Sequence, residues 1–198
     1  TYGRRRRRTS IGLYDFDLLK PPLSYGVSRP DGFSFVPLGF TERMTLREIL
    51  ERHPKGLEYG DIIRAHPVWP ILYDSRSNVL SLPPVINSND LGRITEETRN
   101  VLVEVTGTSY ETVSNALNIV TLSLADRGGR IYSALVKYPY GDRREVRTPS
   151  FKSGVVRTSL GEINGLLGPS LNAQRATALL RRAGFRAMGS GRSSLTIE

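Results

Sequence analysis

Polar side chains that could bind or orient a small ligand lie between positions 72 and 104. Ser81 supplies a hydroxyl and Asn87 supplies an amide. Arg93 supplies a fixed positive charge that could hold a carboxylate or phosphate, and Glu104 supplies a carboxylate that could accept a hydrogen bond from a ligand hydroxyl. Together with the apolar Leu72, they indicate a pocket that binds its ligand without an obvious nucleophile.

Several other kinds of site are poorly supported. The two histidines, His53 and His66, are each followed by proline, and neither lies beside a glycine-rich serine elbow, so we expect them to cap or pack rather than to serve a nucleophilic triad. The absence of cysteine excludes a disulfide, a thiolate nucleophile and a cysteine-ligated metal. No His, Asp or Glu spacing matches a metal-ligand set, and Gly128-Gly129 ends a predicted helix, so we expect no phosphate-binding loop.

A hairpin followed by a polar loop would position the first of these side chains. Apolar runs at 69–73 and 79–82 flank residues 74–78, which have turn chemistry. Pro83-Pro84 must end the second strand, because proline cannot donate to a ladder. Polar residues concentrate at 85–90, just beyond this corner.

A third strand, at 100–106, alternates with a period of two residues. Leu102, Glu104 and Thr106 share one face, and three valines share the other. A buried carboxylate is costly unless it has a partner. Glu104 therefore either forms part of a pocket wall or pairs with Arg93 or Arg99 as a structural bridge. On these residues alone, the structural bridge is the favoured interpretation.

The rest of the chain predicts an α+β protein with mixed or antiparallel sheets and packed helices. Capping boxes predict helices that begin at Thr45, Thr108 and Ser159, and Asn172 is expected to cap another helix. Further short strands are predicted at 11–14, 23–28, 33–37, 131–138 and 143–148. A boundary is expected near Pro149. It would separate a domain at 1–149 from a module at 150–198, whose two helices and flanking strands are typical of a winged helix–turn–helix.

Basic residues are concentrated at the two ends of the chain. Residues 4–8 are five arginines, and seven basic residues face two acidic ones from Ser150 onward, whereas the 16 basic and 17 acidic residues between nearly cancel. The net charge of +9 thus suits a polyanion contacted at the edges of the protein. A solubilising linker is the alternative for Arg4–Arg8, and the sequence favours neither.

The length of 198 residues allows one large domain or two small ones. No run approaches the roughly 18 apolar residues of a membrane span, and no secretory signal is visible, so we expect a cytoplasmic protein without membrane contact. The chain starts at Thr1 rather than Met and stops within an apparent strand at 194–198. We expect it to be a piece of a longer polypeptide.

An ordered series of motifs resembles the beta chain of archaeal and eukaryotic phenylalanyl-tRNA synthetase. The motifs are Arg8–Asp15 (RTSIGLYD), Pro70–Ser75 (PILYDS), Leu80–Ser88 (LSLPPVINS), Arg93–Thr95 (RIT), Thr98–Asn100 (TRN) and Glu104–Thr108 (EVTGT). They are similar to the editing module of that chain. Leu166–Phe185, with LLRRAGF at its end, is similar to the winged-helix-like module that follows. The series is specific as a whole, although no single motif is.

The resemblance implies an editing fold and an aminoacyl-tRNA ester hydrolase, which removes tyrosine wrongly attached to tRNA(Phe). It implies that Leu72, Ser81, Asn87, Arg93 and Glu104 line the editing pocket. Asn87, Ser81 and Arg93 would serve catalysis, and Leu72, Glu104 and Thr106 would bind substrate. Water would be positioned by polar groups and the substrate's ribose hydroxyl, with no metal or covalent intermediate.

The same resemblance implies partners and cofactors for the parent enzyme. The parent phenylalanine-tRNA ligase is a heterotetramer of two alpha and two beta chains, and its ATP and magnesium would not be bound by this segment. Editing itself would need no cofactor. The module at 150–198 would be incomplete. The alternative function is a non-catalytic structural or tRNA-binding module of the synthetase.

Overall fold

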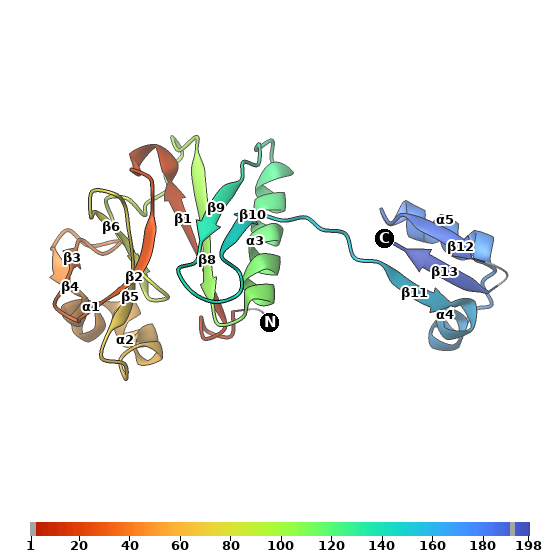
Figure 1. Ribbon diagram of the computed structural model, residues 1–198, viewed down its shortest axis with the longest axis horizontal. Coiled ribbons are helices and arrows are strands. Elements are labelled where there is room, and N and C mark those ends of the chain that lie inside the picture. The colour runs from red at the N-terminus through yellow and green to blue at the C-terminus, as the bar shows by residue number, and fades with distance from the viewer. Residues whose placement is uncertain (1–2, 191–192) are drawn as a thin grey trace. The chain divides into compact units, whose positions relative to one another are not determined.

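The computed structural model describes residues 3–190 and 193–198, and it divides the chain into two compact units, residues 1–150 and 151–198 (Figure 1). Arg192, one of the basic residues counted near the C-terminus, lies outside the described residues. Among the helices that are described, none is both long enough and apolar enough to cross a membrane. The α+β class predicted from the sequence, with antiparallel sheets, is confirmed.

The first unit contains short strands and three α-helices. In chain order its strands are β1 (Thr9–Asp15), β2 (Ser24–Ser28), β3 (Ser34–Phe35), β4 (Met44–Thr45), β5 (Trp69–Tyr73), β6 (Val79–Leu82), β7 (Ile86–Asn87), β8 (Val101–Gly107), β9 (Ala134–Lys137) and β10 (Glu145–Thr148). Its helices are α1 (Leu46–Arg52), α2 (Pro54–Tyr59) and α3 (Tyr110–Ala125), and 3₁₀ turns cover Phe16–Leu18 and Gly60–Ile62.

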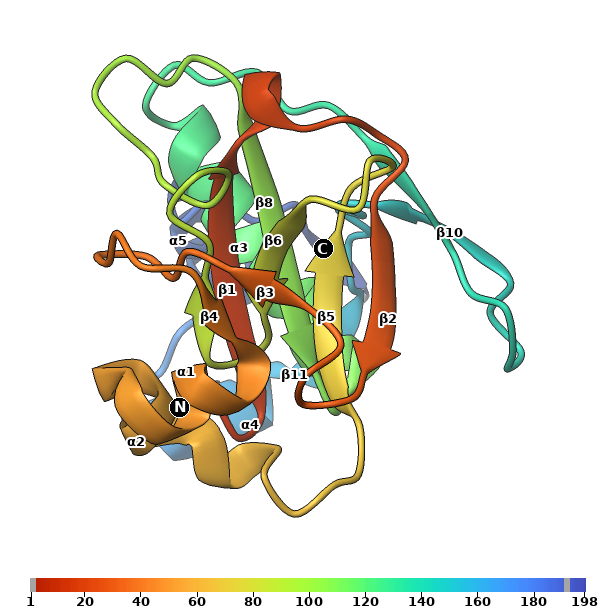
Figure 2. The same cartoon turned by 90° about the vertical axis from the view of Figure 1, so that its left-hand side faces the viewer.

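Two antiparallel sheets carry the centre of this unit. β1 pairs with β8, and a second sheet has the strand order β2-β5-β6-β7. In Figures 1 and 2 the four-stranded sheet lies on one side of the β1–β8 pair and α3 lies on the other. The expected hairpin at 69–73 and 79–82 is confirmed as β5 and β6. The predicted third strand is confirmed as β8, and its partner is β1, which lies about ninety residues earlier in the chain.

The core of the first unit has two parts. The larger cluster lies where α1, with buried Leu46, Ile49 and Leu50, packs against residues of β5 and β6 such as Trp69 and Leu82. A smaller cluster surrounds a single aromatic ring, and its buried members are Tyr14, Leu19, Leu72 and Leu80. Burial of such side chains is the main favourable contribution to folding, and here it fixes β1 against β5 and β6.

Most predicted helix starts are confirmed. Thr45 forms the expected capping box, since its Oγ1 accepts from Glu48 N (3.2 Å) and Glu48 Oε2 accepts from Thr45 N (2.8 Å). The box predicted at Thr108 is wrong by one residue, because Ser109 is the residue that caps α3 and accepts from Thr112 N (3.4 Å). His53 caps α2, because its Nδ1 accepts a hydrogen bond from Lys55 N (3.1 Å), which confirms the capping role expected for this histidine. The predicted hairpin at 131–138 and 143–148 is confirmed over a shorter span, β9 and β10.

The second unit is a three-stranded antiparallel sheet with two helices. Its elements are β11 (Val156–Ser159), α4 (Leu160–Leu167), α5 (Ala173–Arg182), β12 (Ala187–Ser190) and β13 (Ser194–Ile197). The strand order is β11-β13-β12, and both helices precede the β12–β13 hairpin in the chain. The capping residues expected at Ser159 and Asn172 are confirmed. Arg186 and Glu198 join the strand ends by two backbone hydrogen bonds of 2.8 Å.

Candidate functional site

The site lies where the β1–β8 pair faces the four-stranded sheet. Residues directly opposite each other on antiparallel strands share a face of the sheet. Leu72, Ser81 and Asn87 lie opposite one another in turn across β5, β6 and β7, so they share one face. On the other sheet, Gly12 of β1 is opposite Glu104 of β8. Hydrogen bonds between residues of these two faces show that they are turned toward each other.

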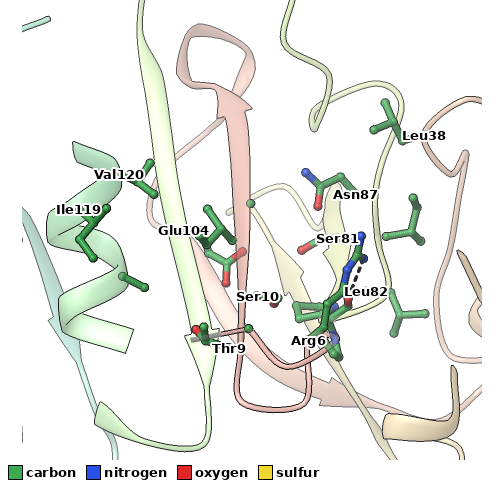
Figure 3. Close-up of a pocket in the computed structure, with 17 residues that line it drawn as sticks. Arg6, Thr9, Ser10, Leu38, Ser81, Leu82, Asn87, Glu104, Ile119 and Val120 are labelled. Atoms are coloured by element: carbon green, nitrogen blue, oxygen red, sulfur yellow. Dashed lines mark hydrogen bonds between the residues drawn. The ribbon is translucent and has the colours of Figure 1, made fainter. Parts of the chain in front are cut away.

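A cavity of about 430 Å³ opens between these elements (Figure 3). This volume lies within the range of roughly 300–1,000 Å³ that is usual for small-ligand sites. Its lining is mostly apolar, with Ser81, Asn87 and Glu104 among its few polar side chains. The lining also extends to Ile119 and Val120 of α3, the helix on the other side of the β1–β8 pair (Figure 3). Such a cavity binds an apolar group, and its few polar side chains select among ligands by hydrogen bonding.

The polar side chains of the site meet at the hydroxyl of Tyr14. This residue has no exposed surface, and its Oη lies 2.9 Å from Ser81 Oγ, 3.2 Å from Glu104 Oε2 and 3.4 Å from Asn87 Oδ1. Ser81 is also buried. One phenol thus joins groups from β6, β7 and β8.

Glu104 supplies a carboxyl group to the cavity lining. Burial raises the pKa of its carboxyl to about 7, although hydrogen bonds from the Tyr14 and Thr106 hydroxyls act in the opposite direction. Its Oε1 is fully buried and has no hydrogen-bond partner among the described residues. A buried acceptor without a donor is unfavourable and rare. A ligand hydroxyl that reached Oε1 would complete its hydrogen bonding.

Two glycines allow backbone and side chains to approach closely here. A Cβ at Gly12 would lie 2.6 Å from Tyr14 Oη and 2.7 Å from Glu104 Oε2, so only glycine leaves room for that pair. A Cβ at Gly92 would lie 2.5 Å from Asn87 Cβ, so the loop after β7 closes tightly over Asn87. The Asn87 carbonyl also accepts from Leu38 N (2.9 Å). The position of Asn87 is therefore fixed by the backbone around it.

An arginine loop, residues 3–8, borders the cavity. Its turn is closed by Arg7 N donating to Arg4 O (3.3 Å) and Arg8 N donating to Gly3 O (3.3 Å). Arg6 lines the cavity, donates to Pro84 O (3.0 Å) and Val85 O (2.7 Å), and lies over the ring of Tyr59 at 4.0 Å. The other four arginines of the loop are exposed. Arg6 thus anchors to the body of the unit a loop whose remaining charges face solvent.

The structure brings three of the sequence-predicted site residues together and leaves three outside the cavity lining. Ser81, Asn87 and Glu104 line the cavity and meet at Tyr14. Leu72 is buried in the smaller core cluster, where it packs around Tyr14 rather than against the cavity. Thr106 shares the Glu104 face of β8, and its Oγ1 lies 2.9 Å from Ser10 Oγ. Arg93 is an exposed loop residue.

The structural ion pair favoured for Glu104 on sequence grounds is absent. Neither Arg93 nor Arg99 forms a salt bridge with it among the described residues, and Arg99 instead donates to Glu96 O (3.1 Å). The expectation fails because both arginines belong to the exposed loop before β8, whereas the Glu104 side chain turns inward. Its partner is a neutral hydroxyl, which explains why burial dominates its pKa.

Neither histidine belongs to the site. His53 is buried as the cap of α2, where burial lowers its pKa, and His66 is exposed. Neither lines the cavity. Within residues 3–190 and 193–198, no group of three or more His, Asp or Glu side chains is arranged to hold a metal ion. The chemistry that the cavity itself offers is hydrogen bonding and positioning by Ser81, Asn87 and Glu104.

Sequence reasoning missed Tyr14, Gly12 and Arg6. A signal for the first two exists, because Gly12 interrupts a predicted strand and a strand glycine often marks a close approach. Tyr14 lies two residues further on and therefore on the same face. Nothing in the local pattern indicates that β1 pairs with β8. Without that pairing, Tyr14 and Glu104 have no reason to meet.

Replacing Glu104 by glutamine is expected to stabilise the fold. The pKa of about 7 exceeds the ordinary value of 4.5, so between these pH values the folded chain binds a proton that the unfolded chain has released, and stability falls as pH rises. At about 1.4 kcal/mol per pKa unit, the penalty above pH 7 is on the order of 3 kcal/mol. Denaturant unfolding at pH 5 and pH 8 should show that the variant gains more at pH 8. An equal gain at both pH values would contradict the raised pKa.

Known proteins resemble this chain in both sequence and structure. No family model matches the chain. It is 48% identical over 182 residues to the "Phenylalanine--tRNA ligase beta subunit" of Thermococcus onnurineus, which covers 92% of this chain and 31% of that protein. The corresponding subunit of Pyrococcus furiosus is 47% identical over 182 residues, with 92% and 32% covered. The chain therefore spans about a third of the length of the curated relatives it matches.

A solved structure also resembles this chain over its whole length. The crystal structure of an N-terminal fragment of the phenylalanyl-tRNA synthetase beta subunit from Pyrococcus horikoshii superposes with a TM-score of 0.91. The two sequences are 42% identical, and the match covers 100% of this chain and 56% of that fragment. At 42% identity, the two chains are alike in sequence as well as in fold.

Proposed function

The chain is a homologue of the N-terminal part of archaeal phenylalanine–tRNA ligase beta subunits, and we propose that it is an editing domain that hydrolyses tyrosine esters of tRNA(Phe). The reaction is the attack of water on the ester between the tyrosine carboxyl carbon and the terminal ribose. It releases tyrosine and restores tRNA(Phe) for correct charging with phenylalanine.

The observation that carries this proposal is the unpartnered Oε1 of Glu104 beside a mostly apolar cavity. Tyrosine and phenylalanine differ by one hydroxyl at the far end of an apolar ring. A hydrophobic pocket rejects an added hydroxyl only weakly, whereas a site built to hydrogen-bond that hydroxyl rejects the analogue lacking it by about 10⁴-fold. A carboxylate with a free acceptor oxygen in an apolar cavity supports selection of tyrosine through a hydrogen bond to its hydroxyl.

Ser81 and Asn87 supply the polar groups for the ester end of the substrate. Both line the cavity, and they lie opposite each other on β6 and β7. The contacts of Asn87 through its side chain are long, 3.4 Å to Tyr14 Oη and 3.5 Å to Leu13 O. Its amide therefore has capacity to donate to a carbonyl oxygen that gains negative charge during attack. In this proposal the ribose hydroxyl of the substrate helps to orient the water.

The wider setting is part of the same proposal. The partners would be tRNA(Phe) carrying tyrosine and the alpha chain of the synthetase, and the site would act in the cytoplasm. Residues 1–150 would be the editing domain, and residues 151–198 would begin a winged-helix-like module. The proposed hydrolysis uses no metal or cofactor.

The direct test is a deacylation assay at matched salt with Tyr-tRNA(Phe) and Phe-tRNA(Phe). The chain, and the full synthetase that contains its sequence, should release tyrosine faster than phenylalanine. Both preparations are needed, because the chain alone could bind tRNA too weakly to turn over. Equal rates for the two esters in the full synthetase, or no release above the uncatalysed rate, would overturn the proposal.

A second candidate function, tRNA binding without catalysis, is favoured by the arginine loop. Four exposed arginines are held next to the cavity by the anchored Arg6. Arginine side chains bind phosphates through paired hydrogen bonds. This function predicts binding of tRNA that depends on salt, with no hydrolysis of either ester.

Replacing Arg5 and Arg7 together by glutamine is expected to weaken tRNA binding and its salt dependence. Each lost phosphate contact reduces the slope of log affinity against log salt by about 0.7–0.9, so the slope should flatten by roughly 1.5. The measurement is tRNA binding at several salt concentrations. Arg29 and Arg43, which are exposed outside the loop, form the matched double control. An unchanged slope for the loop variant would mean that the loop does not contact phosphates.

A further inference from the structure

We infer that Tyr14 is a positioning residue for substrate selection, because its buried hydroxyl holds Oε2 of Glu104 and leaves Oε1 as the acceptor for the phenol of the substrate. The inference rests on the proposed function in one respect, which is the identity of the ligand hydroxyl. The arrangement of the two side chains is a property of the fold and can be tested separately.

Tyr14 acts on the site from behind the cavity lining. It is fully buried, and its ring packs with Leu19, Leu72 and Leu80. It does not line the cavity, yet its hydroxyl reaches three residues that do. A ring held on all sides by close-packed side chains has little rotamer freedom. Its hydroxyl is therefore a fixed point from which the Glu104 carboxylate is oriented.

The number of protons available sets the direction of these hydrogen bonds. A phenol has one proton, whereas a carboxylate oxygen and an amide oxygen can only accept. The ionised Glu104 is the stronger acceptor of the two, since charge-assisted bonds are about twice as strong as neutral ones. Tyr14 therefore donates to Oε2, and Ser81, which has its own proton, can donate to Tyr14 Oη. Neither Tyr14 nor Ser81 then donates to Oε1, which has no hydrogen-bond partner among the described residues.

Gly12 provides a second, independent observation. It lies opposite Glu104 on β1, and a Cβ at this position would come within 2.8 Å of both the Tyr14 ring and its hydroxyl, and within 2.7 Å of Glu104 Oε2. Any larger residue must separate Tyr14 from Glu104. The backbone of β1 is thus shaped to permit this one contact.

The described ionisable groups around Glu104 do not change their charge near neutral pH. Burial, and then the charge of Glu104, raise the pKa of Tyr14 well above its ordinary value, so it stays a donor. On β2, the exposed Tyr25 also has a raised pKa, because reduced hydration and then the charge of Glu104 disfavour its ionised form, so it stays neutral near pH 7. Among the described residues that line the cavity, the other ionisable group is the guanidinium of Arg6, which is always charged. A titration near neutral pH in this site therefore belongs to Glu104.

The test is Tyr14→Phe in the full chain, which keeps the ring and removes the hydroxyl. Two quantities are measured: the titration midpoint of the Glu104 carboxyl by carbon-13 NMR, and the ratio of hydrolysis rates for Tyr-tRNA(Phe) and Phe-tRNA(Phe). We expect the midpoint to rise, because the charged form loses a donor. We expect the ratio to fall by about 10-fold, the typical loss for one hydrogen bond to a charged group.

Tyr73→Phe is the matched control. Tyr73 is a partly buried tyrosine of β5 that stacks on Phe33, and its hydroxyl has no hydrogen bond among the described residues. This variant should leave the midpoint and the ratio as in the unaltered chain. A purely structural role for Tyr14 would lower the rates for both esters equally, and that result would overturn the inference, as would a folded Tyr14→Phe chain with an unchanged ratio.

Gly12→Ala keeps the inference testable if Tyr14→Phe does not fold. It retains both side chains and should separate them, so the same rise in midpoint and fall in ratio are expected. An unchanged midpoint and ratio in this variant would overturn the inference. If the unaltered chain and synthetase hydrolyse neither ester, the proposed function is wrong, and the NMR midpoint still decides whether Tyr14 positions Glu104.

Discussion

Glu104→Ala is expected to abolish most of the preference for the tyrosine ester over the phenylalanine ester. In the unaltered site the phenol of tyrosine completes the hydrogen bonding of Oε1, and phenylalanine leaves this buried oxygen unpaired. Sites of this kind discriminate by about 10⁴-fold, so the ratio of the two hydrolysis rates should fall by up to that factor. The measurement is deacylation of Tyr-tRNA(Phe) and Phe-tRNA(Phe) by the full synthetase carrying the substitution.

Glu104→Gln is the matched control for charge. It has nearly the same shape and keeps one acceptor oxygen, so it should retain part of the preference. In the unaltered protein the preference should weaken as pH falls below about 7, because burial raises the pKa of Glu104 to about 7 and the protonated form loses its charge-assisted bond. The glutamine variant should lack this pH dependence.

A different outcome would assign Glu104 another role. If Glu104→Ala slows hydrolysis of both esters by the same factor, the carboxylate acts on the attacking water as a general base. Its pKa near neutral pH is compatible with that role, so the ratio of the two rates, rather than the rate for tyrosine alone, must be measured. An unchanged ratio would show that Glu104 does not select the tyrosine ester through a hydrogen bond to its phenol.

Asn87→Ala is expected to slow hydrolysis of the tyrosine ester by about 10²-fold, the usual loss when one preorganised donor to a developing oxyanion is removed. The effect should appear mainly in kcat, because the interaction strengthens as charge develops during attack. The tight loop that includes Gly92, together with the bond from Leu38 N, holds the backbone of Asn87 in place. Single-turnover kinetics would separate this effect from weaker binding.

Asn89→Ala is the matched control for this substitution. Asn89 lies two residues further along the same loop, does not line the cavity, and is held through its backbone by the bond from its N–H to Val36 O (2.7 Å). Its side chain should contribute nothing to the reaction. Equal losses for both asparagine variants would mean that the loop is merely destabilised. No loss for Asn87→Ala would remove it from the catalytic step.

Local features of the fold could be predicted from the sequence because they depend on neighbours in the chain. The capping residues at Thr45 and Ser159 were found in this way, and the hairpin of β5 and β6 follows from apolar runs around a turn. Near Ser109 the same reasoning was wrong by one residue, since two adjacent hydroxyl residues offer competing caps.

The candidate site could be predicted only in part. Alternation along β8 placed Glu104 on the face away from the valines. Ser81 and Asn87 were selected as polar residues of the same stretch of sequence, and both line the cavity with Glu104. For Glu104, the residues alone favoured an ion pair with Arg93 or Arg99 over a pocket wall, and no such pair forms among the described residues. That choice depends on where the side chain points relative to the loop of Arg93 and Arg99, and such a relation is not local.

By itself, the sequence determined the short elements, the polarity of each strand face and the set of polar residues available. The tertiary structure decided which faces meet, since the pairing of β1 with β8 joins segments far apart in the chain. That pairing brings Gly12 opposite Glu104 and puts the Tyr14 hydroxyl within 3.2 Å of its carboxylate. Burial between the two sheets then raises the pKa of Glu104, because a charge removed from water and partnered only by a hydroxyl is poorly solvated.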